Sequence, residues 1–520
     1  MLNWLLALAT AGLLVLAFPG FDFAWLAAIA LAPLLVAVAR EPRPWRRFLL
    51  GWACGIVYWF GVCHWIQFTL SVHGGMGNAA GWAVFTLFAL AKGLHMAVFA
   101  LLAGILMRRW WATPAVAALW VAVESTHGFL GFAWLALGNA GIDMSLPMRL
   151  APFTGVYGVS FVFAMMSAAL ALRLLGRPRL ELAWIAALLF LPLLPPLADA
   201  QHGRESALLV QPNLSETEEW TAEPVDRAAR AMAEDSARAA AIDSAHPPSI
   251  VVWPEVPAPF FYDEDPNFRA VAAGLARSTR AALLMGTVAR TPAGAPLNSA
   301  TLVSPEGFRI SRYDKVNLVP FGEYVPWPLG ALTEKISKEA GDFAAGSGVV
   351  VSPVADHKIG VFICYESVFP NFVRRFAAGG AEALFTISND GWFGQTAARR
   401  QHLEIVGMRA AENRRWILRA ANDGITASID PAGRVRSTLP LFVEATSSVR
   451  FNYETAQTFY TRHGDWFPVL CALLAVGCLA AGKFARVSAA QPDGSTQARV
   501  LRVFACPFFV SDAFRPSITR

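Results

Sequence analysis

Long apolar runs fill most of the first 199 residues, and one more lies near the end of the chain. An α-helix rises about 1.5 Å per residue and the hydrocarbon layer of a membrane is about 30 Å thick, so roughly 20 largely apolar residues are needed for one crossing. The runs therefore predict a multi-pass α-helical membrane domain with eight spans. These predicted spans are residues 3–19, 23–39, 48–68, 80–107, 112–137, 150–174, 182–199 and 464–483.

The fifth predicted span, residues 112–137, contains two ionisable residues, Glu124 and His127. Ionisable side chains are costly in lipid, and where they occur they often have a function. These two residues either have such a function or lie near the outer interface of the membrane.

Basic residues accumulate after every second predicted span, whereas loops on the other side, such as residues 70–79, are nearly free of Arg and Lys. Arg and Lys gather on the cytoplasmic side of short membrane loops. Both chain ends are therefore expected inside the cell, with the first segment kept as an anchor because it lacks a basic start and a cleavage site. Residues 200–462 are then expected outside a bacterial inner membrane. The basic clusters are Arg40, Arg43, Arg46 and Arg47; Arg108 and Arg109; Arg173, Arg177 and Arg179; and Lys483 and Arg486.

Composition supports a membrane protein. With 55% hydrophobic and 16% charged residues and a mean hydropathy of +0.43, the chain is too apolar for a soluble protein. The net charge of +5 could suggest nucleic-acid binding, but the Arg residues lie in short clusters beside the apolar runs and not in one basic stripe. Of the six cysteines, Cys364 alone lies in the polar middle segment, which does not favour a disulfide framework.

Residues 200–462 show short apolar or β-branched runs that alternate with Ala- and Arg-rich helical stretches. Such alternation is typical of an α/β domain. The strands are predicted at residues 206–211, 249–253, 282–288, 298–303, 358–364 and 383–388, and the helices at 225–244, 267–278, 371–378 and 401–414. The predicted organisation is a seven-span domain over 1–199, an outer α/β domain over 200–462, an eighth span over 463–484 and a cytoplasmic tail over 485–520, to which no function is assigned.

Polar side chains end two predicted strands of the α/β domain. The apolar run at residues 250–254 stops at Glu255, and the run at 358–363 stops at Cys364. A Pro- and Gly-rich segment that carries Lys315 lies between them. Ligands of open α/β sheets gather at the carboxyl ends of strands, so these three side chains are candidates for one site.

The three residues have the chemistry that acyl transfer needs. A thiol has a pKa of about 8.5, so its attack on an ester needs a group that removes the proton and a group that stabilises the oxyanion. Glu255 can do the first and Lys315 the second. Singly, Cys364 also fits a packing role, Glu255 a helix cap and Lys315 a solvated loop charge. The three together favour a catalytic site.

Trp253-Pro254-Glu255, the Lys315 loop and Cys364-Tyr365-Glu366, in this order, resemble the Glu-Lys-Cys triad of the nitrilase, or carbon–nitrogen hydrolase, superfamily. With the predicted spans on both sides, the chain resembles the apolipoprotein N-acyltransferase family over all but its last thirty or so residues. The resemblance extends to Asn317 to Pro326, to Ser388-Asn389-Asp390-Gly391-Trp392-Phe393-Gly394, to Gln401-His402, and to Met408-Arg409-Ala410 with Glu412 and Arg414.

The resemblance implies a nitrilase-like αββα sandwich for the α/β domain. It also implies that Cys364 is the nucleophile, Glu255 the general base and Lys315 the oxyanion partner. The backbone N–H of Tyr365 is then a candidate for a second oxyanion donor, as at other strand-to-helix elbows.

Four further residues match positions of the family that support the site or bind substrate. Glu323, Tyr365 and Glu366 match supporting residues, and Trp220 matches an aromatic residue near the substrate entrance. These four assignments rest on the resemblance.

The resemblance implies a ping-pong N-acyltransferase that takes part in lipoprotein biosynthesis. The acyl donor is expected to be a phospholipid, typically phosphatidylethanolamine, and the acceptor the N-terminal amine of diacylglyceryl-cysteine on an apolipoprotein. No metal or other cofactor is expected, since the scheme needs none and the nine His residues form no spaced ligand cluster. A monomer is expected because one chain supplies every proposed catalytic group.

Two other functions remain open from the sequence. A membrane-tethered amidase or nitrilase could use the same three residues to hydrolyse a small amide. A tether needs one span, however, whereas eight are predicted here. A noncatalytic scaffold for lipoproteins is the other alternative, and the presence of all three catalytic residue types argues against it.

Overall fold

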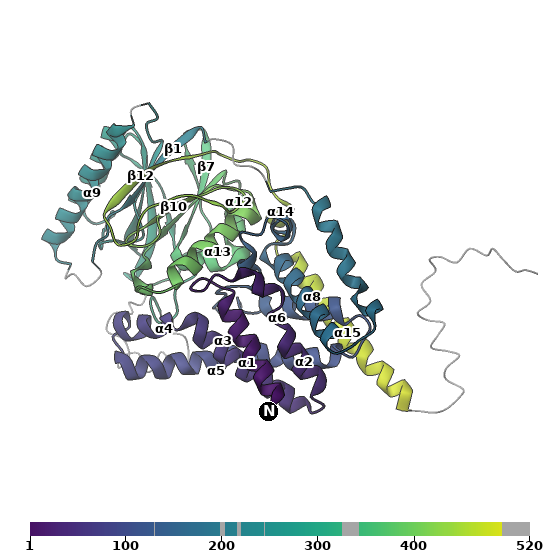
Figure 1. Cartoon of the computed structure of the whole chain (residues 1–520). Coiled ribbons are helices and arrows are strands. Elements are labelled where there is room, and N and C mark those ends of the chain that lie inside the picture. The colour runs from purple at the N-terminus through teal and green to yellow at the C-terminus, as the bar shows by residue number, and fades with distance from the viewer. Residues whose placement is uncertain (129–130, 198–202, 216–219, 244, 325–342, 491–520) are drawn as a thin grey trace, which may run out of the picture.

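A computed structural model describes residues 1–128, 131–197, 203–215, 220–243, 245–324 and 343–490 of the chain, with side chains up to residue 481. Helices from the first 200 residues and from the C-terminal region form one part, and two β-sheets with their covering helices form the other (Figure 1). Residues 491–520, most of the predicted tail, lie outside the described residues.

The first part consists of helices packed around one apolar core. Several of them are short and separated by breaks, as at Pro19-Gly20 after the first helix. The α-helices are α1 Leu2–Leu16, α2 Ala32–Arg40, α3 Pro44–Cys63, α4 Trp65–Phe68, α5 Gly77–Leu106, α6 Ala112–Ser125, α7 Ala151–Thr154, α8 Val156–Leu174 and α15 Trp466–Ala490. The 3₁₀ segments are η1 Ala24–Ala28, η3 Leu137–Gly141, η4 Pro147–Leu150 and η5 Arg179–Leu193, and η2 Thr69–His73 is a π-helix.

The prediction of eight spans is not confirmed. Among the described residues, α5 and α8 are long and apolar enough to cross a membrane, and α3 joins them if it forms one span with the segment Trp65–His73, which is bent away from it by 61°. The seventh predicted span, residues 182–199, falls largely on η5, whose residues form a 3₁₀ helix. The fifth is only half helical, because α6 ends at Ser125 and residues 131–136 are not helical.

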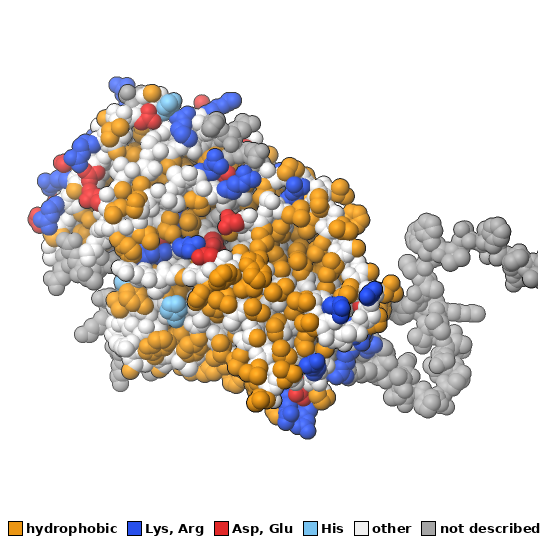
Figure 2. Space-filling model, viewed as in Figure 1, with side chains coloured by type: hydrophobic (Ala, Val, Ile, Leu, Met, Phe, Trp, Pro, Cys, Tyr) orange, Lys and Arg blue, Asp and Glu red, His pale blue; other side chains and the backbone are white. Residues whose placement is uncertain are grey.

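The surface of the helical part is nevertheless suited to lipid. Figure 2 shows apolar side chains gathered on the part made of helices, while Lys, Arg, Asp and Glu are more frequent on the part that contains the two sheets. Large apolar side chains point outward on the helices, with Leu87 of α5 65% exposed and Leu473 of α15 67% exposed. Such a contiguous apolar surface is unfavourable in water and favourable in a bilayer. The chain is therefore built to contact a membrane.

The second part contains two six-stranded sheets of mixed direction. Their strand orders are β12-β1-β2-β3-β4-β5 and β11-β10-β9-β8-β7-β6. The first sheet is parallel at β1-β2-β3 and the second at β7-β8-β9. The strands are β1 Glu205–Gln211, β2 Ile250–Val252, β3 Ala282–Arg290, β4 Pro296–Val303, β5 Arg309–Asp314, β6 Val351–Val354, β7 His357–Ile363, β8 Ala383–Ser388, β9 Ile417–Ala421, β10 Ala427–Ile429, β11 Val435–Thr438 and β12 Ala445–Phe451.

The two sheets pack face to face, and helices cover their outer faces. Side chains of a strand alternate between its two faces, and β1 shows this directly: Leu209 joins Val361 of β7 in the core between the sheets, whereas Leu208 packs with Met232 under the helices. The helices are α9 Ala222–Ile242 and α10 Pro266–Thr279 on the first sheet and α12 Pro370–Ala378 and α13 Ala398–Asn413 on the second. The predicted αββα sandwich is therefore confirmed.

Helix α13 connects the sandwich to the helical part of the chain. The indole Nε1 of Trp134 donates to Oε1 of Gln401 over 2.8 Å, and Oε1 of Glu412 accepts from the backbone N–H of Val156 over 2.8 Å. Val156 is the first residue of α8, where a backbone N–H has no partner inside the helix. Both contacts are buried, so they hold the two parts in a defined position.

Candidate functional site

The three candidate catalytic residues come from the ends of three strands. Glu255 follows β2, Lys315 follows β5 in the same sheet, and Cys364 follows β7 in the facing sheet. All three side chains line one cavity. The structure therefore brings together residues that lie up to about a hundred positions apart in the sequence, as the strand-end pattern predicted.

Lys315 lies between two carboxylates. Its ammonium Nζ is 3.0 Å from Oε1 of Glu255 and 3.0 Å from Oε1 of Glu323. The amide of Asn298 on β4 donates to the same two oxygens, over 2.8 Å and 2.7 Å. The second oxygen of Glu255 accepts from the backbone N–H of Asn389 over 2.9 Å. These hydrogen bonds hold all three charged groups in place although they are buried.

The charge of Lys315 is stable in this environment. Burial by itself lowers the pKa of the Lys315 ammonium, but the carboxylates of Glu255 and Glu323 outweigh burial and hold that pKa well above its ordinary value. Lys315 is 1% exposed and remains a cation at neutral pH. A fixed positive charge shielded from water is suited to stabilise a developing oxyanion.

Cys364 occupies a sharp turn from strand to helix. It is the first residue of the 3₁₀ turn η7 Cys364–Val368, and its φ of 47° lies in the left-handed region, which is unfavourable for a residue with a Cβ atom. Backbone strain of this kind is concentrated at functional sites. The turn directs the Cys364 side chain into the cavity that Glu255 and Lys315 line.

The Cys364 thiol is protonated at rest. Burial raises the pKa of this thiol above its ordinary value and the Glu255 charge raises it further, while Lys315 acts in the opposite direction. A thiolate therefore forms only when a base accepts the proton as the sulfur attacks. Glu255 is the carboxylate whose charge acts most strongly on this thiol.

Glu366 ties the Lys315 segment to the Cys364 turn. Its carboxylate accepts from the backbone N–H groups of Val316 over 2.8 Å and of Ile363 over 2.8 Å, and from the hydroxyl of Tyr313 over 2.7 Å. Burial raises the pKa of Glu366 to about 7, although these donors lower it. Glu366 thus sets the position of two chain segments relative to each other and does not itself line the cavity.

The remaining two candidates connect the site to its surroundings. The hydroxyl of Tyr365 donates to the carbonyl oxygen of Gly131, in the segment after α6, over 2.5 Å. Trp220 is half-buried, lines the same cavity and packs against the α9 side of the first sheet. The structure therefore brings all seven sequence candidates to one region.

A second buried network supports the backbone of Cys364. Nε2 of His402 on α13 donates to the carbonyl oxygen of Cys364 over 3.1 Å. The other ring nitrogen faces Asp390 and Arg419, and Arg419 donates to both oxygens of Asp390 over 2.6 and 2.5 Å. Burial alone raises the pKa of Asp390, but the Arg419 guanidinium holds it well below its usual range. The network fixes the turn that carries Cys364.

The cavity that contains these side chains lies between the two parts of the molecule. Its volume is about 580 Å³, and its lining is mostly apolar. The helical part and loops of the sandwich both contribute walls. The residues from the membrane part are Trp65, Ile66, Thr69, Leu70, His73, Val84, Phe88, Gly131 and Phe132, and those from the sandwich include Trp220, Val319, Phe321, Phe343, Tyr365, Trp392 and Phe393.

Sequence reasoning did not identify Asn298 or Arg419 as site residues. Arg419 interrupts an otherwise apolar strand, and Asn298 lies in a strand that also carries Ser299 and Thr301. Both side chains are at positions that the strands bury. A buried polar side chain requires a partner, and that requirement is the signal that could have marked both residues.

Comparison with known proteins covers both parts of the chain. Residues 10–169 match the model of the apolipoprotein N-acyltransferase N-terminal domain, and residues 201–460 match that of the carbon-nitrogen hydrolase family. The chain is similar to the apolipoprotein N-acyltransferase of Geobacter metallireducens, with 33% identity over 90% of this chain and 93% of that protein. It is also similar to the apolipoprotein N-acyltransferase of Azotobacter vinelandii, with 34% identity over 91% of this chain and 94% of that protein.

Among solved structures, an amidase from Nesterenkonia sp. aligns with 51% of this chain and 94% of its own, at 19% identity and a TM-score of 0.37.

Proposed function

Because the chain belongs to the apolipoprotein N-acyltransferase family, we propose that it transfers an acyl chain from a phospholipid, through a thioester on Cys364, to the N-terminal amine of diacylglyceryl-cysteine on apolipoproteins. The chain is accordingly a membrane-associated acyltransferase that matures lipoproteins. Matches to relatives of this name extend over both the helical part and the sandwich.

One observation carries the proposal. The buried cluster of Glu255, Lys315 and Glu323 shares a cavity of about 580 Å³ with Cys364, and helices of the membrane part form one wall of that cavity. Acyl chains that leave lipid for water lose about 0.8 kcal/mol per CH₂ group. A nucleophile at the boundary of the apolar helices can accept an acyl chain without that loss.

In the first half-reaction, Glu255 takes the proton of the Cys364 thiol while the sulfur attacks the ester carbonyl carbon of the phospholipid. A C–S bond forms, and the electron pair of the C=O bond moves to oxygen. The Lys315 ammonium, with the backbone N–H of Tyr365, stabilises this oxyanion. The C–O ester bond then breaks, the lysophospholipid oxygen takes the proton back from Glu255, and the acyl group remains on Cys364 as a thioester.

In the second half-reaction, the neutral amine of the acceptor attacks the thioester carbonyl carbon. Glu255 accepts the proton that the nitrogen loses, and Lys315 again stabilises the oxyanion. The amide C–N bond forms, the C–S bond breaks, and the proton passes from Glu255 to the leaving sulfur. Cys364 returns to its thiol form, so one base serves both halves of a ping-pong cycle.

We further propose the arrangement in the cell that the sequence predicts. The seven-span domain over residues 1–199 and the span over 463–484 cross the bacterial inner membrane, and the catalytic domain over 200–462 lies in the periplasm. The alternation of loops that are rich in Arg with loops that are nearly free of it supports this topology. Phosphatidylethanolamine is the donor we expect, and the enzyme acts as a monomer because all proposed catalytic groups come from one chain.

The proposal is tested by intact mass spectrometry of the purified protein in detergent after incubation with phosphatidylethanolamine. The wild-type chain gains the mass of one acyl group minus one hydrogen, and Cys364→Ala, which keeps its fold, gains nothing. Transfer activity without any adduct on the wild type would contradict the covalent mechanism. Rapid conversion of the adduct to free fatty acid in the presence of acceptor would instead favour the hydrolytic alternative.

A further inference from the structure

Two buried ionisable side chains of the helical part take no part in the reaction just described. Lys92 lies in α5 and is 5% exposed, and Glu124 lies in α6 and is 9% exposed. Ionisable groups among membrane helices are unfavourable unless they have partners. Each of the two side chains has a backbone partner in the same segment, residues 131–137.

Lys92 holds the start of this segment. Its ammonium Nζ donates to the carbonyl oxygen of Phe132 over 2.9 Å. The same ammonium lies over the ring of Trp59, 5.0 Å from its centroid, and 5.6 Å from the centroid of Phe132. A hydrogen bond from a charged donor is among the stronger ones in proteins, and the aromatic faces replace part of the lost hydration.

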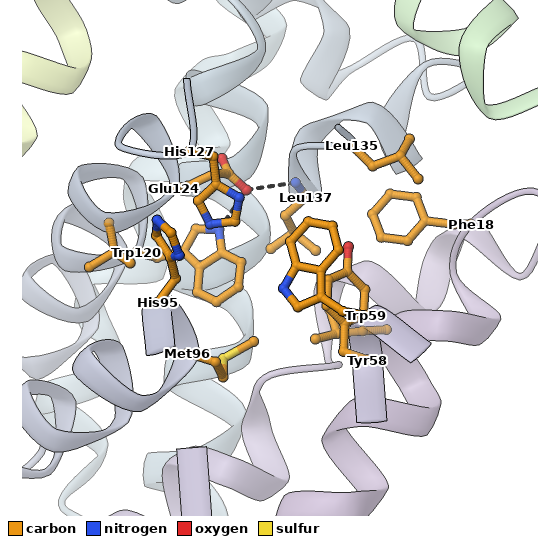
Figure 3. Close-up of a pocket in the computed structure, with 12 residues that line it drawn as sticks. Phe18, Tyr58, Trp59, His95, Met96, Trp120, Glu124, His127, Leu135 and Leu137 are labelled. Atoms are coloured by element: carbon orange, nitrogen blue, oxygen red, sulfur yellow. Dashed lines mark hydrogen bonds between the residues drawn. The ribbon is translucent and has the colours of Figure 1, made fainter. Parts of the chain in front are cut away.

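Glu124 holds the end of the segment. Its Oε1 accepts from the backbone N–H of Leu137 over 2.7 Å and from Nε1 of Trp120 over 3.1 Å (Figure 3). Figure 3 also shows His127 beside Glu124, at the edge of a cavity of about 40 Å³ among the helices. Side chains of α5 and α6 therefore fix both ends of the segment.

The segment itself reaches the catalytic site in three places. The carbonyl oxygen of Gly131 accepts from the hydroxyl of Tyr365, the residue after the nucleophile. Phe132 forms part of the wall of the catalytic cavity. Trp134 donates to Gln401, whose neighbour His402 donates to the carbonyl oxygen of Cys364.

We propose that Lys92 and Glu124 are positioning residues for acylation: they fix residues 131–137, and this segment in turn holds Tyr365 and the cavity wall against the Cys364 turn. The inference rests on the proposed function, because it concerns the formation of the acyl-enzyme. It assigns to the helical part a role in the chemistry of Cys364 that goes beyond contact with lipid.

The test measures single-turnover acylation of the full-length protein in detergent micelles over a range of phosphatidylethanolamine concentrations. Lys92→Met removes the donor to Phe132 and lowers the maximal acylation rate about tenfold, the loss that one charge-assisted hydrogen bond would cause. The half-saturating phospholipid concentration changes less than about twofold, because the other cavity walls remain. Lys92→Arg keeps a charged donor and recovers most of the rate.

Glu124 supplies an independent pair of variants in case Lys92→Met does not fold. Glu124→Gln keeps an oxygen that accepts from Leu137 and acylates at close to the wild-type rate, whereas Glu124→Leu acylates about tenfold more slowly. The matched control is Thr86→Val on α5, where the hydroxyl bonds only to the carbonyl of Trp82 in its own helix among the described contacts. Thr86→Val leaves the rate unchanged.

A double-mutant cycle tests the route through Tyr365. Lys92→Met and Tyr365→Phe act on the same segment, so the loss of rate in the double variant is smaller than the product of the two single losses. Independent losses in this cycle, or wild-type acylation by both Lys92→Met and Glu124→Leu, would overturn the inference while the proposed function stands. A wild-type protein that forms no acyl adduct would refute the proposed function itself.

Discussion

Lys315→Met tests whether the buried charge cluster is as tightly coupled as its geometry indicates. The substitution removes an ammonium that lies 3.0 Å from one oxygen of Glu255 and 3.0 Å from one oxygen of Glu323. The two carboxylates then remain in one buried site, 6% and 8% exposed, with the amide of Asn298 as a shared donor but no counter-charge from Lys315. Met keeps the length and the apolar part of the side chain, so the change isolates the charge.

The expected loss is large because one member of a buried ion pair is removed and the other is left uncompensated. Such changes reduce stability by about 3–5 kcal/mol. For a domain of roughly 250 residues this corresponds to a decrease in apparent Tm of roughly 10 °C. Thermal unfolding in detergent micelles measures the shift, and intact mass spectrometry shows that acylation of Cys364 is also lost.

Arg290→Met is the matched control. Arg290 pairs with Glu264 over 3.1 Å, and the two side chains are 46% and 50% exposed. Exposed ion pairs contribute about 0–1 kcal/mol, so the apparent Tm of this variant changes by no more than about 3 °C. If Lys315→Met loses no more stability than Arg290→Met, the three charged groups are not coupled as described, and Lys315 is not held in place by the two carboxylates.

Two further predictions concern protons at the site. Burial raises the pKa of the Cys364 thiol, so alkylation by iodoacetamide speeds up with rising pH beyond pH 8.5; a plateau near pH 7 would show a resting thiolate and contradict this reasoning. Burial also raises the pKa of Glu366 from 4.5 to about 7, so the folded protein holds a proton that the unfolded chain has lost. The stability that this proton provides is fully present below pH 4.5, and it declines as the pH rises from 4.5 to about 7. Glu366→Gln flattens the decline in a series of unfolding measurements between pH 4.5 and 7.5, and an unchanged pH dependence would assign it to other groups.

Much of the sandwich could be predicted because its buried strands are continuous apolar runs. All six predicted strands and all four predicted helices of residues 200–462 match elements of the structure to within a few residues at each end. The missed strands have a different character. In β9, Arg419 interrupts the apolar pattern, and its burial becomes understandable only once Asp390, from another part of the chain, is placed beside it.

The helical part was harder to predict because an apolar run can contact either lipid or another part of the protein, and the sequence pattern is the same in both cases. Phe132 and Trp134 were assigned to a span, yet they belong to a non-helical segment. Phe132 lines the cavity that contains Cys364, and Trp134 packs against the sandwich. Their apolar character serves the contact between the two parts and not lipid, and a sequence pattern alone does not distinguish these environments.

For the site, the sequence pointed to side chains at strand ends and missed side chains whose role depends on tertiary partners. Cys364 directly follows an apolar strand and Glu255 comes just after one, so their positions could be recognised locally. Asn298 and Lys92 lie inside regular elements, and each acts through a contact with a chain segment at least 25 residues away. Such contacts follow from the fold and not from local spacing.

The central claim is that the acyl group on Cys364 is passed to an amine. The most direct measurement isolates the acylated wild-type protein, removes excess phospholipid and adds a synthetic peptide that begins with diacylglyceryl-cysteine. We predict that the acyl mass disappears from the protein and appears as an amide on the peptide's N-terminus, in equal amounts. An adduct that persists in the presence of the peptide, or that is released only as free fatty acid, would contradict the account.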